Sequence, residues 1–338
     1  MSINPVVHYQ QVLSMALEER SRGYQDLVSN NNALLAVLKR KGLWRPYSGP
    51  RIRETLQIAK QDAQWYSGYD FLANPPIELF NDAFFTPKMV AVPISIALEE
   101  ILNNEGENQQ MDVMASYMDA AERSLNDTMD AAIHGDGTAN GGKQLGGLGL
   151  AVPIVVNNGV YGGIDRANAI WRTSTFDANS FDTTIGTQVT KDTIRPFLNK
   201  IMTQRARGRR YADLLIMSPE HYAAYDAATT SIQRIQREGG LAKLGFQSLE
   251  YVGGGKRAEI VLDGGIGSNM PANTTYGLDT DAIRIRYNPN RNFDKLFEGE
   301  GQKPINQDAI AQYIGWMGEL TLNNPLFCWR FYDSNPAA

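Results

Sequence analysis

The chain has 338 residues, a formal net charge of -5 at pH 7, 43% hydrophobic residues and 20% charged residues. This balance is typical of a folded protein with about two domains and a substantial core. It excludes an intrinsically disordered chain and a polycation that would coat nucleic acid or a membrane surface. Cys328 is the only cysteine, which excludes an internal disulfide framework and a cysteine-rich zinc site and predicts a buried, inert thiol.

The first 42 residues are predicted to form an arm of short helical pieces. The clearest helix lies in NNNALLAVLKRKG, where an asparagine can cap the start and Gly42 can terminate the last turn. The stretch before it is polar and is interrupted by Gly23, so we expect a mobile or partner-dependent arm. The opening residues lack the pattern of a secretion signal, and no apolar run approaches the ~20 residues of a membrane span.

Two strands and a long aromatic loop are predicted after the arm. Two-residue alternation of apolar side chains predicts strands at 52–58 and 89–96, and Pro93 places the second strand at an edge or a bulge. A loop this long without a core of its own predicts a projecting element whose side chains need a partner surface. Its aromatic residues are Trp65, Tyr66, Tyr69, Phe71, Phe80, Phe84 and Phe85.

The longest predicted helix covers residues 109–133. Apolar residues between Met111 and Ala132 recur at spacings of three and four, while acidic residues occupy the other faces. A rise of about 1.5 Å per residue gives a helix roughly 35 Å long, a length suited to a structural spine. Its methionines are predicted to form a packing stripe, because thioethers fill irregular gaps.

Residues 134–144 read HGDGTANGGKQ and contain the Gly-x-x-x-x-Gly-Lys spacing of a phosphate-binding loop. Gln144 stands where that loop needs a magnesium-binding hydroxyl, a helix precedes the loop instead of a strand, and no clear helix opens after Lys143. We therefore interpret the stretch as a helix end followed by a flexible turn. A nucleotide-dependent enzyme that uses loop 137–143 is the alternative from a different class.

The rest of the chain mixes helices and strands in α+β fashion. Residues 148–156 are predicted to form a strand, and WRTSTFDANSFDTT a polar loop. A helix ending at Gly208, the buried strand DLLIMS and a helix capped by Ser218 and opened by Pro219 follow. FQSLEYV, AEIVLDG, TTYGLDT and AIRIRYN are predicted strands, and the remaining strands break at residues 323–325.

No motif predicts catalysis. The three histidines, His8, His134 and His221, are never spaced as a metal-binding pair, and no nucleophile motif accompanies the His134-x-Asp136 pattern. We assign His134 a helix-capping or surface role. The basic stretch RARGRR, residues 205–210, is predicted to be a subunit-contact surface at a helix end, with a nucleic-acid patch or a merely solvated surface as alternatives.

The order of these elements resembles the major capsid proteins of tailed bacteriophages, whose fold is named after phage Hong Kong ninety-seven. The resemblance rests on an arm, a long aromatic loop between two strands, a spine helix that ends in a glycine-rich turn, and a mixed domain. That domain contains NTTYGLDTDAIRIRYNPNRNF and PINQDAIAQYIGWMGELTLNNP. The resemblance implies an N-terminal arm at 1–42, an extended loop at 43–96, a peripheral domain at 97–189 and 311–338, and an axial domain at 190–310.

The function that this resemblance implies is structural. The chain is expected to assemble without catalysis, metal or cofactor into hexamers and pentamers of an icosahedral virion head, built in the bacterial cytoplasm around double-stranded DNA that it binds without sequence specificity. Scaffolding, portal and decoration proteins are the expected partners, and no membrane is involved. An encapsulin-like bacterial compartment that encloses an enzyme is the alternative with the same fold.

Subunit contacts are expected at the loop, the spine, the glycine-rich turn and the basic stretch. Cations of the loop should meet acids on the spine of an adjacent subunit, and the exposed aromatic residues should supply most of the contact energy. The expected contact residues are Arg51, Arg53, Lys60, Trp65, Tyr66, Tyr69, Lys88, Asp112, Asp119, Asp127, Lys143, Arg205, Arg207, Arg209 and Arg210.

Overall fold

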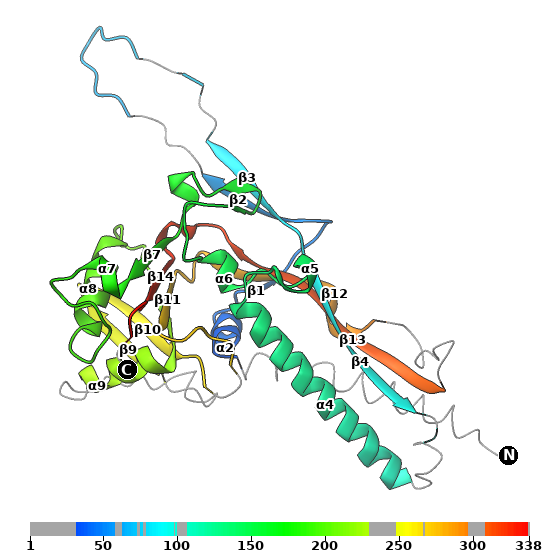
Figure 1. Cartoon of the computed structure of the whole chain (residues 1–338). Coiled ribbons are helices and arrows are strands. Elements are labelled where there is room, and N and C mark those ends of the chain that lie inside the picture. The colour runs from blue at the N-terminus through cyan, green and yellow to red at the C-terminus, as the bar shows by residue number, and fades with distance from the viewer. Residues whose placement is uncertain are drawn as a thin grey trace.

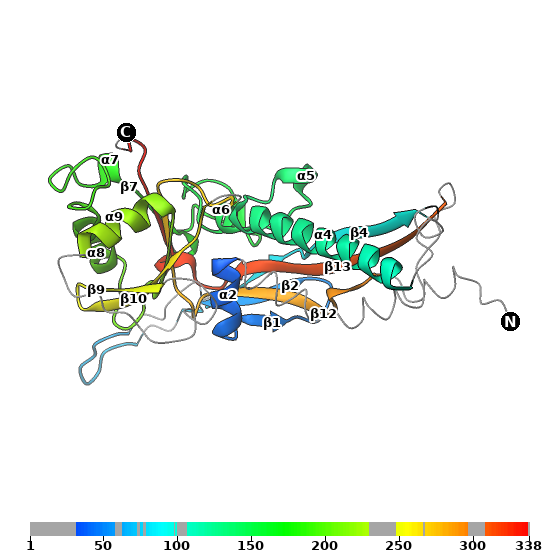
Figure 2. The same cartoon turned by 90° about the horizontal axis from the view of Figure 1, so that it is seen from below.

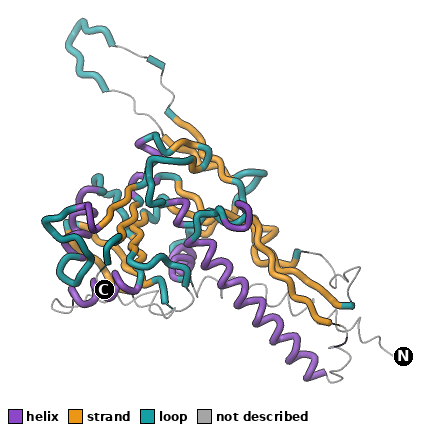
Figure 3. Tube along the Cα trace, viewed as in Figure 1, coloured by secondary structure: helices purple, strands orange, loops and turns teal. Residues whose placement is uncertain are grey.

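The computed structural model describes residues 32–57, 63–72, 75–76, 79–97, 99, 107–229, 248–265, 268–296 and 308–336. Most of the elements lie in two sheets with their covering helices (Figure 1; Figure 3). A long helix and the longest strands extend from the body in one direction, and a two-stranded hairpin projects in another (Figure 1). In the part of the chain that is described, no helix has the length and apolar character needed to cross a membrane.

A four-stranded sheet forms the elongated part of the molecule. Across the sheet, its strands are β1 (Trp44–Pro46), β12 (Ile283–Lys295), β13 (Ala309–Leu322) and β4 (Lys88–Ala97). β13 pairs antiparallel with both neighbours and is largely buried along its length. β4 lies at the edge, where Pro93, which has no N–H to donate, is tolerated. The predicted edge position of Pro93 is therefore confirmed.

The spine helix α4 (Glu107–His134) lies along β4 on one face of this sheet (Figure 2). The helix predicted at 109–133 is confirmed, with both ends within a turn of the expected positions. The predicted apolar stripe is buried over the part of the helix whose side chains are described. Its buried members are Met118, Ala121, Leu125, Met129, Ala132 and Ile133.

Helix α2 (Ala33–Arg40) packs into the same core. The Asn32 side chain accepts a hydrogen bond from the Leu35 N–H at 3.1 Å, so the predicted asparagine cap is confirmed. All residues from Ala33 to Leu38 are buried. The predicted partner-dependent arm is therefore wrong for this helix, because the chain's own core covers it. Residues 1–31 of the predicted arm lie outside the described residues.

A six-stranded sheet forms the other part of the body. In order, its strands are β7 (Ser174–Asp177), β14 (Trp329–Tyr332), β11 (Thr274–Leu278), β8 (Leu214–Met217), β10 (Lys256–Leu262) and β9 (Ser248–Gly253). The predicted buried strand DLLIMS is confirmed as β8. Helices α8 (Ile194–Gln204) and α9 (Pro219–Thr229) pack together in its core. β14, which follows β13 and the turn η3 (Pro325–Phe327), inserts between β7 and β11.

Two predictions for the middle of the chain are wrong. The strand predicted at 148–156 is helix α6 (Leu148–Ala151) followed by turns. Gly147, the residue before this helix, packs so closely against the last turn of α4 that an added Cβ would lie 2.1 Å from the Ile133 carbonyl oxygen. The predicted polar loop holds β7 and α7 (Ala178–Phe181), because Phe176 and Ala178 are buried between polar residues.

The projecting hairpin consists of β2 (Ile52–Gln57), β3 (Phe80–Phe85) and the loop between them. The strand predicted at 52–58 is confirmed, and its side chains alternate between buried and exposed. The region predicted to be loop contains β3, and β3 rather than β4 is the partner of β2. The small ladder of β5 (Val160–Tyr161) and β6 (Ile164–Asp165) abuts the base of the hairpin, where the Phe84 N–H donates to the Gly162 carbonyl.

Candidate functional site

The hairpin of β2 and β3 projects from the body (Figure 1). Its loop carries large aromatic side chains that are exposed to solvent. Trp65 and Tyr69 are completely exposed and Phe71 nearly so, while Tyr66 keeps 67% of its surface exposed. Folding alone does not favour such exposure, because burying an aromatic side chain releases a large apolar surface from water. The loop is therefore a candidate contact surface for a partner. The expected exposure of Trp65, Tyr66 and Tyr69 is confirmed, and their role in contact stays a prediction.

A buried carboxylate attaches the hairpin to the long sheet. Glu54 on β2 is 5% exposed and accepts a hydrogen bond from Arg286 Nε at 2.7 Å and one from Thr321 Oγ1 at 3.3 Å. Arg284 Nη1 lies 4.0 Å from the same carboxylate. The charge of Glu54 is thus shared between β12 and β13. No role was predicted for Glu54, although a lone acid among the apolar residues that alternate along 52–58 was an available signal.

The predicted loop cations have different surroundings. Arg51 is exposed just before β2, and Lys60 lies outside the described residues. Arg53 pairs with Asp82 of the same hairpin at 2.6 Å, and this hydrogen bond holds the pKa of the Asp82 carboxyl below its ordinary value. Lys88 Nζ donates to the Gly142 carbonyl at 2.5 Å. Arg53 and Lys88 thus have partners within the subunit.

The predicted spine acids lie on α4. Asp119 and Asp127 are exposed on this helix. Asp112 lies nearer the start of the same helix. Two exposed carboxylates along a helix can attract the cations of a neighbouring subunit, although such pairs stabilise weakly in water. A meeting between these acids and the loop of an adjacent subunit stays a prediction.

The glycine-rich stretch after α4 is a turn, as predicted. Positive φ angles at Gly137, Gly141 and Gly142 reverse the chain after His134, around the four-residue helix α5 (Ala139–Gly142). A strand does not precede the stretch and a long helix does not follow it, so the geometry of a phosphate-binding loop is not met in this described segment. Lys143 is exposed at the end of the turn.

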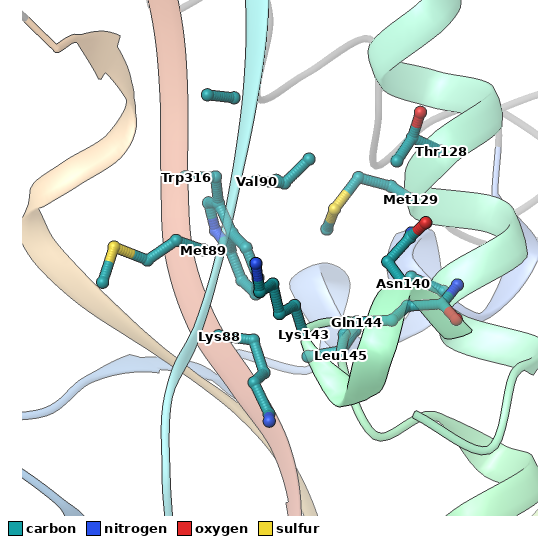
Figure 4. Close-up of a pocket in the computed structure, with 12 residues that line it drawn as sticks. Lys88, Met89, Val90, Thr128, Met129, Asn140, Lys143, Gln144, Leu145 and Trp316 are labelled. Carbon is teal, nitrogen blue, oxygen red and sulfur yellow. The ribbon is translucent and has the colours of Figure 1, made fainter. Parts of the chain in front are cut away.

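Lys143 borders a pocket of about 260 Å³ between β4 and the end of α4 (Figure 4). Lys88 and Trp316 lie on its walls together with Met129 and Asn140. The lining mixes polar and apolar side chains, and Lys88 already donates to the Gly142 carbonyl. Lys143 was predicted as a subunit contact, and that role stays a prediction. The pocket could not be predicted from the sequence, because β4 and the turn are brought together only by the fold.

The basic stretch 205–210 is a tight turn after α8. The helix ends at Gln204 and not at Gly208 as predicted. Arg205 is half-buried with its guanidinium carbon 5.4 Å from the centre of the Phe176 ring, and burial lowers the pKa of this arginine. Arg205 thus contributes to packing within the subunit.

The other three arginines of this turn differ in their contacts. Arg207 and Arg210 exchange backbone hydrogen bonds of 2.9 and 3.1 Å. The Arg210 side chain pairs with Asp279 at 3.2 Å and lies 5.6 Å from the Phe327 ring. All three are exposed, but within the described residues the side chains of Arg207 and Arg209 form no ion pair. The predicted contact surface therefore presents two such guanidinium groups outward, and its role in subunit contact stays a prediction.

One cluster in the described residues has the composition of a metal site. His134, which was predicted to cap the helix or lie at the surface, is buried, and the prediction is wrong in this respect. Its Nε2 lies 3.7 Å from Asp130 Oδ1 and 3.3 Å from Asp263 Oδ2. The ligand atoms of these three residues all lie within 4.8 Å of one another. Asp130 and His134 are four apart on one helix, which was a usable signal, but nothing in the sequence brings Asp263 to them.

Comparisons with known proteins find similar structures but no similar sequences. No protein-family model and no curated protein matches the chain. A chain of the cyanophage A-1(L) capsid asymmetric unit matches with a TM-score of 0.65 at 15% identity, over 90% of this chain and 93% of that one. The capsid of a native GTA particle matches with a TM-score of 0.53 at 10% identity, over 88% of this chain and 90% of that chain. A chain of Gordonia phage Cozz matches with a TM-score of 0.51 at 16% identity, over 88% of this chain and 86% of that chain.

These likenesses span nearly the full length of each chain, and at such low identity they show the fold. The fold is that of phage capsid chains, and the expected α+β fold of the Hong Kong ninety-seven type is confirmed.

Proposed function

We propose that this chain is the major capsid protein of a tailed bacteriophage, a structural subunit that assembles with copies of itself into the icosahedral head. The observation that carries the proposal is the fold likeness to the cyanophage A-1(L) capsid, which extends over 90% of this chain. The exposed aromatic loop supports it independently, because a surface of this kind is suited to burial against another subunit.

The finer parts of the proposal concern assembly and contents. Hexamers and pentamers form the closed shell in the bacterial cytoplasm, with scaffolding, portal and decoration proteins as partners. The shell encloses double-stranded DNA without reading its sequence, and the subunit performs no catalysis. A hairpin of two strands is marginally stable by itself, and its aromatic loop would be ordered by the neighbour that it covers. Each closed contact then stabilises the folded subunit by mass action.

The proposed domains follow the expected scheme with two refinements. The expected bounds are 1–42 for the arm, 43–96 for the extended loop, 97–189 with 311–338 for the peripheral domain, and 190–310 for the axial domain. Helix α2 (33–40) packs into the core of the subunit, so the proposed arm ends before it. β7 and β14 belong to the same sheet as β8 to β11. We therefore include residues 174–177 and 329–332 in the axial domain, which then contains the whole six-stranded sheet.

Electron microscopy of the purified full-length protein tests this function. We expect closed hollow particles of uniform size. Protein that stays monomeric over a wide range of concentrations and salt conditions would overturn the proposal. Particles recovered from the native source should contain nuclease-resistant DNA, whereas an enclosed enzyme in place of DNA would favour the bacterial compartment.

A further inference from the structure

We propose that Asp130, His134 and Asp263 form a binding site for one divalent transition-metal ion within each subunit, with Zn²⁺ as its best-matched ligand. The site joins the last turn of the spine helix to the loop that follows β10 of the six-stranded sheet. It goes beyond the shell function and does not depend on it, because all three residues come from one chain.

The spacing of the three ligand atoms fits a metal ion. Zinc bonds of about 2.0 to 2.1 Å in tetrahedral geometry separate neighbouring ligand atoms by about 3.4 Å. Nε2 of His134 lies 3.3 Å from the Asp263 oxygen and 3.7 Å from the Asp130 oxygen. All three atoms lie within 4.8 Å of one another. The cluster therefore needs little movement to surround an ion.

Buried polar atoms without hydrogen-bond partners also indicate a metal site. His134 is 5% exposed, yet neither of its ring nitrogens has a hydrogen-bond partner among the described residues. Oδ2 of Asp263 is also buried without such a partner, although it lies 3.3 Å from Nε2. A buried polar atom without a partner is costly. An ion between the three residues would engage Nε2 and Oδ2 together.

The charge of the cluster is suited to a cation. Two carboxylates lie close together in a poorly hydrated position, and within the described ranges neither forms an ion pair with a lysine or an arginine. The donors to Asp130 are neutral amides, from Asn32 Nδ2 at 2.6 Å and from Asn269 N and Nδ2 at 2.8 and 3.2 Å. A divalent ion would cancel both negative charges, which amide donors do not do.

The surrounding contacts are those of a supported metal ligand. Asn32 and Asn269 hold both oxygens of Asp130 in place, and hydrogen bonds of this kind orient ligating carboxylates in metal sites. An imidazole among the ligands favours zinc and other transition metals over Ca²⁺ and Mg²⁺, which prefer oxygen alone. Asn32 is also the cap of α2. One ion would thus tie together the spine, α2 and the loop after β10.

Metal titration of the full-length protein tests this site. After treatment with a chelator and its removal, wild-type protein should bind about one Zn²⁺ per chain, with a melting temperature several degrees higher than without metal. Mg²⁺ should give no comparable shift. His134→Gln and Asp263→Asn should lose both zinc binding and the shift. Asp127→Asn removes an exposed acid of the same helix and should behave as wild type.

Two results would overturn the proposal. One is wild-type protein that binds no zinc, and the other is undiminished binding in both ligand variants. Should the variants fail to fold, X-ray absorption of the zinc-loaded wild type decides the matter. It should show one imidazole nitrogen with oxygen neighbours at about 2.0 to 2.1 Å, and an all-oxygen or sulfur-containing shell would contradict the site. Particle formation is scored separately, so a failed metal site leaves the shell proposal intact.

Discussion

At the scale of single residues, Glu319 is the buried acid with the most clearly altered chemistry among the described residues. It lies on β13, and its Oε1 accepts a hydrogen bond from the Gly146 N–H at 2.8 Å, in the turn after the spine. Burial raises the pKa of Glu319 to about 8, although the Gly146 N–H and the charge of Lys88 act in the opposite direction. The carboxyl is therefore mostly protonated in the folded chain at neutral pH.

This shifted pKa predicts how stability depends on pH. The folded chain keeps the Glu319 proton up to about pH 8, whereas the unfolded chain releases it near the ordinary value of 4.5. The contribution of Glu319 to the free energy of unfolding is complete below pH 4.5 and falls by up to about 1.4 kcal/mol per unit until pH 8. Glu319→Gln keeps an oxygen acceptor for Gly146 and should remove this decline.

Denaturant unfolding across this pH range measures the effect. The Glu319→Gln variant should gain stability relative to wild type as the pH rises, and the difference should level off above pH 8. A constant difference between the two proteins from pH 5 to 8 would show that Glu319 is ionised in the folded state.

The residue scale is also where sequence reasoning was least complete. Asp130 and His134 could be paired from their helical spacing, but Asp263 reaches them only because the loop after β10 folds over the spine. His134 was assigned a capping or surface role because it lies at the end of a helix. Its position in the helix does not reveal that a later segment of the chain covers it. Cys328, by contrast, is buried as predicted, because free cysteine generally behaves as a small apolar residue.

At the scale of elements, local periodicity was sufficient where one face of an element is buried. The spine and β2 were predicted from spacings of three to four and of two residues, respectively. Residues 148–156 were mispredicted because a short apolar run suits a strand and a buried helix equally. β3 was missed because exposed aromatic residues hide its alternation, with Phe80 and Phe84 facing solvent and Ala83 and Phe85 buried.

The attachment of the hairpin gives a prediction for Glu54. Replacing Glu54 with Ala leaves Arg286 and Arg284 without their shared carboxylate, and both arginines are three-quarters or more buried. We expect a loss of about 2 to 4 kcal/mol in the free energy of unfolding, below the value of a fully buried pair because water still reaches the guanidinium groups. Hydrogen exchange at β2 and β3 should quicken before exchange at β13 does.

Arg53→Ala is the matched control for this prediction. It removes the exposed pair with Asp82 on the other face of the same strand, so stability should change little. Equal losses in Glu54→Ala and Arg53→Ala would contradict the role of Glu54 as the anchor.

At the scale of the whole molecule, the order of elements predicted the fold better than any motif did. The arm, loop, spine and mixed domain suggested the fold of a capsid subunit, and the likeness to the cyanophage capsid confirms this fold over 90% of the chain. The domain bounds stay a prediction. The contacts between subunits could not be predicted from the sequence in the same way. The spacing of apolar residues indicates which face of an element is buried within its own chain, and it does not indicate which exposed residues meet another subunit. Exposed Trp65 and Tyr69 were noticeable only because their loop has no core.

These two aromatic residues give the prediction for assembly. Trp65→Ala combined with Tyr69→Ala removes side chains that are completely exposed in the subunit, so the melting temperature of the unassembled protein should not change. Each truncation of a contact hot spot costs about 2 kcal/mol or more, and the loss recurs at every contact of the shell. The yield of closed particles should therefore fall at least tenfold.

Size-exclusion chromatography and electron microscopy measure that yield. Val155→Ala truncates an exposed apolar residue in the turn after α6 and serves as the control. Normal particles from the double aromatic variant would exclude the loop as an essential contact.

The position of β14 has a consequence for the order of events in the cell. β14 lies between β7 and β11, so the six-stranded sheet stays open at its interior until residues 329–332 have been synthesised. Trp329 and Phe331, which fill the core of this sheet, arrive with the same strand. A nascent chain on the ribosome therefore holds an incomplete sheet. In the shell proposed above, a copy that is still being translated would lack this finished sheet and could not yet join the assembly.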